Sequence, residues 1–232
     1  MLNVLIISLS RAKDRQEIVQ QILNKFEYRD NVHVYPAFDG QNIMNKTLSI
    51  KIDAPGYCYR KGDSMKSGEL GCTLSHIGCI SMAKSLGWEY VIILEDDITL
   101  CDDFEKRIRY LLKNVPSDWE HIYLSGVPHL SESEKNNPIL NSFLNIIPSV
   151  WSDETPGYII KNSAFDKMIK ILSSLETTTD DMINKSIFEY SNLKSYMYFP
   201  FTLYVNIMVE SQIASVIKTS HPSHLYFKNR LL

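Results

Sequence analysis

The sequence predicts an α/β fold with a mostly parallel central sheet flanked by helices. Its first forty residues carry a β-branched apolar run at 3–8, an amphipathic run at 14–26 and a β-prone run at 32–37. That order predicts a strand, a helix and a second strand, the start of a parallel sheet. A further apolar run at 88–94 lacks polar alternation, as expected for a strand buried on both faces.

The other elements follow in chain order. Apolar residues recur at helical spacing in four further segments, which predicts helices at 68–86, 104–112, 163–175 and 180–190. We expect short strands at 121–125 and 157–161 and a β-prone tail at 197–216. Polar and proline-containing stretches predict loops at 41–67 and 126–150.

Composition limits the function classes. The 232 residues fit one large domain, and 44% hydrophobic with 22% charged residues excludes a disordered chain. A net charge of −3 gives no electrostatic basis for nucleic-acid binding. No run approaches the ~20 apolar residues of a membrane span, and the N-terminal run lacks the basic region of a signal peptide. We therefore expect a cytoplasmic enzyme.

The four cysteines, Cys58, Cys72, Cys79 and Cys101, form no CxxC pair and have no histidine at zinc-ligand spacing. A structural zinc is therefore not expected. In a reducing compartment we expect buried cysteines that act as small hydrophobic residues, rather than disulfides.

Three consecutive acids, Glu95, Asp96 and Asp97, follow the apolar run at 88–94. Ligands of open α/β sheets bind beyond the carboxyl ends of the strands. Neighbouring carboxylates repel one another unless a cation neutralises them, and oxygen ligands suit Mg²⁺ or Mn²⁺. In an extended chain Glu95 and Asp97 face one side and Asp96 the other, so we expect Asp97 and Glu95 to hold the metal. The alternative is a solvated turn in which Asp96 or Asp97 caps a following helix.

A metal held by two carboxylates is typical of enzymes that bind substrate phosphates. The chain has no GxxxxGKS/T segment, no GxGxxG fingerprint and no GxSxG elbow. Their absence disfavours P-loop nucleotidases, the usual dinucleotide-binding enzymes and serine hydrolases.

The block SGELGCTLSH at 67–76, followed by ILEDD at 93–97 and preceded by AFDG at 37–40, resembles glycosyltransferase family 25. That family includes bacterial lipooligosaccharide glycosyltransferases and collagen glycosyltransferase domains. The resemblance implies a GT-A-like nucleotide-diphospho-sugar transferase that inverts the anomeric carbon. It also implies UDP-galactose or UDP-glucose as donor, Mn²⁺ or Mg²⁺ as cofactor, and a lipooligosaccharide or other glycan hydroxyl as acceptor.

The resemblance also implies how the chain is organised. We expect one domain over 1–232, with a nucleotide-sugar-binding half at 1–125, an acceptor and catalytic half at 126–217, and a tail at 218–232. The tail carries His221, His224, Lys228 and Arg230. It would fold over the diphosphate or contact the inner face of the membrane, or else be a frayed, solvated terminus.

The expected donor-binding residues come from four segments: Ser8, Arg11, Arg15, Asp39, Gly40, Glu69, Ser75, His76, Glu95 and Asp96. Several have a purely structural alternative. Arg11 and Arg15 would then lie in a solvated first helical turn, Asp39 would form an Asx turn, and His76 would be a satisfied core residue.

Inverting transfer needs a general base that takes the proton of the acceptor hydroxyl. We expect Asp180 to serve, with Asp181 next and Asp153 and Glu154 as weaker candidates. Helix N-capping is the alternative for Asp180 and Asp181. Two other functions stay open: a metal-dependent nucleotidyl or phosphoryl transferase, and a non-catalytic module that binds nucleotide sugars.

Overall fold

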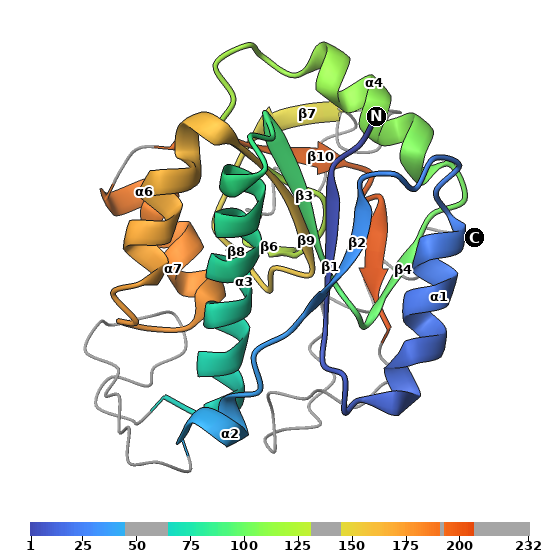
Figure 1. Cartoon of the computed structure of the whole chain (residues 1–232). Helices are drawn as coiled ribbons and strands as arrows, with labels where there is room; N and C mark the ends of the chain where they lie inside the picture. The colour runs from blue at the N-terminus through green and yellow to red at the C-terminus, as the bar shows by residue number, and fades with distance from the viewer. Residues whose placement is uncertain (45–64, 131–144, 191–192, 207–232) are drawn as a thin grey trace.

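A seven-stranded sheet forms the centre of the protein in the computed structural model, which describes residues 1–44, 65–130, 145–190 and 193–206 (Figure 1). The strand order is β2-β1-β3-β9-β5-β10-β7. The strands are β1 (Val4–Ser8), β2 (Val32–Pro36), β3 (Tyr90–Glu95), β5 (His121–Tyr123), β7 (Asn145–Pro148), β9 (Gly157–Lys161) and β10 (Ser195–Phe199). Two small sheets pair β4 (Ile98–Leu100) with β11 (Leu203–Val205), and β6 (Val127–Pro128) with β8 (Ser152–Asp153).

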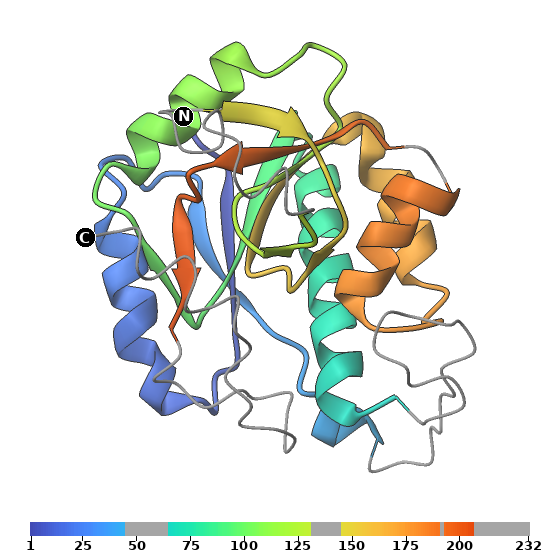
Figure 2. The ribbon, with the colours of Figure 1, turned by 180° about the vertical axis from the view of Figure 1, so that it is seen from behind.

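Helices cover both faces of the sheet (Figures 1 and 2). On one face lie α1 (Gln16–Asn24) and α4 (Phe104–Asn114), and on the other α3 (Ser67–Ser85), α6 (Asn162–Leu172) and α7 (Thr179–Lys185). Short helical turns precede α1 (Lys13–Arg15), follow β2 (α2, Gly40–Met44) and continue α7 as a π-helical turn (Ser186–Tyr190). The α/β class is therefore confirmed.

The alternation of side chains along the strands separates two hydrophobic cores. In β1, Val4 and Ile6 pack with α1 and α4, whereas Leu5 and Ile7 pack with α3 and α6. In β3 the same alternation places Ile92 in the first core and Ile93 in the second. Both faces of these strands are buried, which explains the unbroken apolar runs in the sequence.

The sheet is mostly parallel, as predicted, but not entirely. β1 pairs in parallel with β2 and β3, and β5 with β10, whereas β9 is antiparallel to both of its neighbours and β7 is antiparallel to β10. Strand β9 comes from the predicted second half and lies between β3 and β5 of the first. The two predicted halves thus build one sheet.

One local prediction is wrong, and so is the helix-capping part of one alternative that the sequence left open. β7 occupies part of the predicted loop at 126–150, because its pairing with β10 is a long-range contact with little local signal. No helix directly follows the three acids: the chain turns at Asp96 and Asp97 and continues as β4, which pairs with β11. Neither acid caps a helix there.

Some predictions fall outside the described residues: most of the loop at 41–67, Cys58, and the tail at 218–232. Cys72, Cys79 and Cys101 are free thiols; Cys79 is buried, as expected, whereas the expectation of burial is wrong for Cys72 and Cys101, which are half-buried. None of the helices in the described part of the chain is long and apolar enough to cross a membrane. The cytoplasmic location stays a prediction.

The carboxyl ends of β1, β2 and β3 lie at one edge of the sheet. Ile7 of β1 is level with Glu95 of β3, and Ser8 is level with Pro36 of β2. The segments that leave these strands therefore meet at this edge, where ligands of α/β folds bind.

Two glycines let the segment after β2 pack tightly on α3. A Cβ on Gly40 would lie 1.6 Å from the carbonyl oxygen of Ser67, and one on Gly71 would lie 2.5 Å from the carbonyl oxygen of Phe38. Both clashes are with backbone, so they cannot be relieved by rotating a side chain. Gly40 is thus fixed by helix packing, whatever it does for a ligand.

Gly71→Ala should lower the free energy of unfolding by about 1–3 kcal/mol, because its methyl group collides with the Phe38 backbone. Helix propensity alone would make the same change stabilising by about 1 kcal/mol. The matched control is Gly78→Ala on the same helix, whose Cβ meets the tip of the Tyr35 side chain and should cost less. Urea denaturation of both variants measures the difference, and a more stable Gly71→Ala protein would contradict the packing described.

Candidate active site

A pocket lies at the carboxyl edge of β1, β2 and β3, against α3. Eight of the ten predicted donor-binding residues line it: Arg11, Arg15, Asp39, Gly40, Ser75, His76, Glu95 and Asp96. The remaining lining is contributed by the same segments and includes Cys72 and the apolar side chains of Ile7, Leu9 and Phe38. The structure therefore brings together most of the residues that the sequence singled out.

Arg15 neutralises two of the three acids. Its Nη1 donates to Asp96 Oδ1 at 2.5 Å and its Nη2 lies 3.3 Å from Asp97 Oδ2. Arg15 is only 5% exposed, so the alternative of a solvated helical turn is wrong for it. The expected alternation of Asp96 and Asp97 is also wrong, because the chain turns there and one guanidinium reaches both carboxylates.

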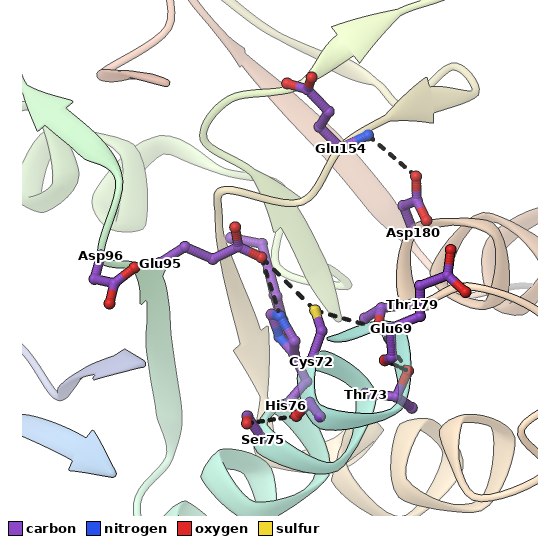
Figure 3. Close-up of polar contacts among 12 residues, drawn as sticks. Glu69, Cys72, Thr73, Ser75, His76, Glu95, Asp96, Glu154, Thr179 and Asp180 are labelled. Atoms are coloured by element: carbon purple, nitrogen blue, oxygen red, sulfur yellow. Dashed lines mark hydrogen bonds and ion pairs between the residues drawn. The ribbon is translucent and has the colours of Figure 1, made fainter. Parts of the chain in front are cut away.

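Glu95 extends in another direction, toward α3 (Figure 3). Its Oε1 lies 3.5 Å from His76 Nε2 and 4.0 Å from Cys72 Sγ. His76 Nδ1 lies 3.0 Å from the hydroxyl of Tyr158 on β9, and Thr179 donates to Cys72 Sγ at 3.5 Å. Glu95 is thus the acid that Arg15 does not pair.

Burial and mutual repulsion hold these acids close to their neutral forms. Burial, then the charges of Asp96 and Glu154, raises the pKa of Glu95 to about 8. Burial and the charge of Glu95 raise the pKa of Asp97 to about 7. Burial lowers the pKa of His76 to about 4, so this imidazole is neutral at pH 7. Such shifts are typical of functional sites.

Asp97 has one carboxylate oxygen that is open to a divalent cation. Asp97 Oδ1 is buried and has no hydrogen-bond partner among the described residues. An unsatisfied buried carboxylate oxygen is costly unless a cation or donor reaches it. Asp97 would supply one oxygen ligand, and Glu95, whose carboxylate points toward α3, would have to turn toward Asp97 to supply another. A cation held by both would relieve the repulsion that raises both pKa values.

The segment after β2 is held by its own hydrogen bonds. Asp39 Oδ2 accepts from Arg11 Nε at 2.8 Å, and Asp39 Oδ1 accepts from the Gln41 amide at 3.1 Å, as in an Asx turn. Ser75 Oγ donates to the Gly71 carbonyl at 2.6 Å and accepts from the Phe38 amide at 2.9 Å. Asp39 and Ser75 therefore shape the pocket wall, and Arg11, partly exposed, lies at its rim.

Two predicted donor contacts are not among the pocket-lining residues. Ser8 Oγ accepts from Gln16 Nε2 at 3.3 Å, which ties the end of β1 to α1. Glu69 accepts from the Lys66 amide at 2.7 Å and so caps the start of α3. The structure gives both residues positioning roles.

The start of α7 brings only one of the two candidate bases toward the acids. Asp180 Oδ2 accepts from the Glu154 amide at 3.4 Å, and the charge of Asp180 is felt at Glu95, Cys72 and His76. Burial raises the pKa of Asp180 above its usual value. Asp181 is 1% exposed and accepts from Thr177 at 3.2 Å, so it stabilises the helix start instead.

Sequence reasoning missed four groups around His76, Glu95 and Asp180: Cys72, Tyr158, Thr179 and the backbone of Glu154. Glu154 has a φ of +62°, a left-handed conformation that is rare for a residue other than glycine, and its amide contacts Asp180. Tyr158 and Thr179 reach the site through long-range packing of β9 and α7 on α3. Cys72 had a local signal, because it lies four residues before His76 on one helix.

The sequence of this chain is similar to those of a known protein family and its members. The family described as "Glycosyltransferase family 25 (LPS biosynthesis protein)" matches residues 1–183. Human procollagen galactosyltransferase 2 is 28% identical over 173 residues, which cover 72% of this chain and 27% of that protein. The probable inactive glycosyltransferase 25 family member 3 of Bos taurus is 26% identical over 173 residues, 72% of this chain and 28% of that protein.

The chain thus spans about a quarter of the length of the curated relatives it matches. Among solved structures, a glycosyltransferase involved in the glycosylation of the major capsid of PBCV-1 aligns over 81% of this chain and 75% of that chain. Its sequence identity is 12% and its TM-score 0.43.

Glu95→Gln should make the metal-free protein less sensitive to alkaline pH. An acid whose pKa is raised on folding binds more protons in the folded than in the unfolded chain, so the free energy of unfolding falls as pH rises toward about 8. Chemical denaturation at several pH values between about 6.5 and about 8.5 measures how steeply the free energy of unfolding falls with pH. This range lies above the one in which His76 titrates. The variant's slope should be shallower than that of the unaltered protein.

The matched control is Glu17→Gln, which removes an exposed acid on α1. This variant should keep the slope of the unaltered protein. Equal slopes for Glu95→Gln and Glu17→Gln would show that Glu95 is ionised in the folded protein throughout this range.

Proposed function

The chain belongs to glycosyltransferase family 25, and from that premise we propose that it transfers a hexose from a UDP-sugar to a glycan hydroxyl with inversion. The observation that carries the proposal is the buried Asp97 Oδ1, which has no hydrogen-bond partner among the described residues and follows directly on Glu95 and Asp96, two lining residues of the pocket. The family and the topology of the sheet support a GT-A-type domain. The names of relatives favour galactose as the transferred sugar.

Asp97 and Glu95 would hold Mn²⁺ or Mg²⁺. When bound there, the ion supplies positive charge to the diphosphate leaving group. Arg15 contributes indirectly, because its ion pairs with Asp96 and Asp97 fix the acids that face the ligand. Arg11, at the rim, offers an exposed guanidinium to the nucleotide, and Asp39 holds that guanidinium in place.

Asp180 would take the proton from the acceptor hydroxyl as the hydroxyl oxygen attacks the anomeric carbon. Its buried setting raises its pKa, which makes it a stronger base than a solvated aspartate. The Glu154 amide holds one carboxylate oxygen, Oδ2. The acceptor would be a lipooligosaccharide or another glycan, and the lipid-linked case would place the reaction at the cytoplasmic face of a membrane.

A second candidate function has specific support. Relatives of similar identity include proteins described as inactive or probable inactive members of the family. The chain would then bind nucleotide sugars without turnover. A metal-dependent nucleotidyl or phosphoryl transferase, the third reading, would cleave a phosphorus–oxygen bond instead of the glycosidic bond.

The function is tested by incubating the protein with UDP-galactose, UDP-glucose and other UDP-sugars, with and without Mn²⁺. We expect release of UDP and free or transferred hexose from one of the first two donors, only with the metal. Donor binding without UDP release would favour the non-catalytic module. Release of UMP or of a sugar phosphate would favour the nucleotidyl or phosphoryl transferase, and no binding of any UDP-sugar would refute the proposal.

Asp180→Asn should lower kcat by ~10²–10⁴-fold, the usual contribution of a general base, with little change in the KM for the donor. Asp181→Asn is the matched control, since this neighbour is buried and its carboxylate accepts a hydrogen bond from Thr177. It should lower the melting temperature but leave kcat within a few-fold. Steady-state kinetics on the two folded variants measures both effects. A larger loss of kcat in Asp181→Asn than in Asp180→Asn would contradict the assignment of Asp180 as the general base.

A further inference from the structure

We propose that Cys72, His76 and Glu95 form a second metal site, selective for a borderline divalent cation such as Zn²⁺. Cys72 and His76 lie four residues apart and so share one face of α3, and Glu95 reaches them from the end of β3 (Figure 3). One thiol sulfur, one imidazole nitrogen and one carboxylate oxygen lie within 4.8 Å of one another.

The distances are close to those of a coordination sphere. Zinc binds sulfur at about 2.3 Å and nitrogen or oxygen at about 2.0–2.1 Å, so neighbouring ligands of a tetrahedral site are about 3.3–3.6 Å apart. Here the nitrogen–oxygen distance from His76 to Glu95 is 3.5 Å and the sulfur–oxygen distance from Cys72 to Glu95 is 4.0 Å. The third distance, from the Cys72 sulfur to the His76 nitrogen, is at most 4.8 Å, so these side chains would have to move together by up to about 1 Å to surround one ion.

A second, independent observation at His76 indicates that this cluster binds an ion. Its side chain is 1% exposed, and its Nε2 has no hydrogen-bond partner within the described part of the chain. Nδ1 is already occupied by the Tyr158 hydroxyl at 3.0 Å, so Nε2 is the nitrogen that faces Glu95 and Cys72. A metal-bound imidazole has this arrangement, with its second nitrogen held by another protein group.

The ligand types select the ion. Thiolate and imidazole favour Zn²⁺, Co²⁺ and related ions over Mg²⁺, which prefers oxygen ligands. Burial and the charge of Glu95 raise the pKa of Cys72, so a bound cation would take the place of the thiol proton. Thr179 donates to the sulfur at 3.5 Å and works in the direction of the thiolate. All three ligands line the pocket, so three protein ligands would leave a fourth position facing it, as in catalytic zinc sites.

This site does not depend on the proposed glycosyl transfer, although it shares Glu95 with the cation proposed for the diphosphate. Cys72 and His76 would bind only the Zn²⁺-like ion, and Asp97 would bind only the Mn²⁺ or Mg²⁺ ion proposed for the diphosphate. The two proposals can therefore fail separately, and the test below uses neither nucleotide sugar nor turnover.

The test is a titration of the reduced, metal-free full chain with Co²⁺, followed by absorption spectroscopy. We expect one equivalent to bind with a thiolate-to-cobalt charge-transfer band in the near ultraviolet and strong visible bands of four-coordinate cobalt, and Zn²⁺ to displace it. Cys72→Ser should abolish the charge-transfer band, and His76→Gln should weaken binding at least tenfold. Cys101→Ser, the matched control for a half-buried cysteine outside the cluster, should leave spectrum and affinity unchanged.

Absence of the charge-transfer band from the unaltered protein would overturn the proposal, and so would a band that persists in Cys72→Ser. The cluster would then be a hydrogen-bonded thiol, imidazole and carboxyl group without a metal. Because the unaltered protein gives a decisive result by itself, a variant that fails to fold does not leave the question open.

Discussion

Carboxylates crowded at the end of one buried strand are the constraint on which this structure depends. Glu95, Asp96 and Asp97 are adjacent in sequence, and the buried Arg15 guanidinium pairs with Asp96 and Asp97. Glu95 turns to α3, where a neutral imidazole and a thiol offer no compensating charge. The remaining charge is tolerated because the folded chain keeps protons on Glu95 and Asp97, whose pKa values are about 8 and about 7. A cation removes the need for those protons.

The rest of the fold holds other groups around this charge. Parallel pairing of β1, β2 and β3 brings three strand ends to one edge, and Gly40 and Gly71 allow the segment after β2 to pack on α3 without a gap. The resulting pocket has two chemically different sides. One side carries the carboxylates of Asp39 and Asp96, which pair with Arg11 and Arg15. The other carries sulfur and nitrogen, and α7 adds Asp180 beside it.

The sequence was sufficient for the parts of the fold and site that depend on local pattern. The apolar runs of β1 and β3, the glycine turn after β2 and the acids at the strand end are each visible within ten residues. The direction of β9, the edge strand β7 and the contact of Arg15 with both Asp96 and Asp97 depend on partners distant in sequence. Local pattern could not separate Asp180 from Asp181 either, because both suit a helix start and only packing shows that Asp181 is buried.

The most direct test of this account is the number of protons released when Mn²⁺ and UDP bind. Isothermal titration in buffers of different ionisation enthalpy measures that number. Because a cation at Glu95 and Asp97 must displace the protons held there, binding at about pH 7 should release protons, and binding at about pH 9 should release fewer. Binding without proton release at about pH 7 would show that these carboxyl groups are not the cation's ligands, and would contradict the account.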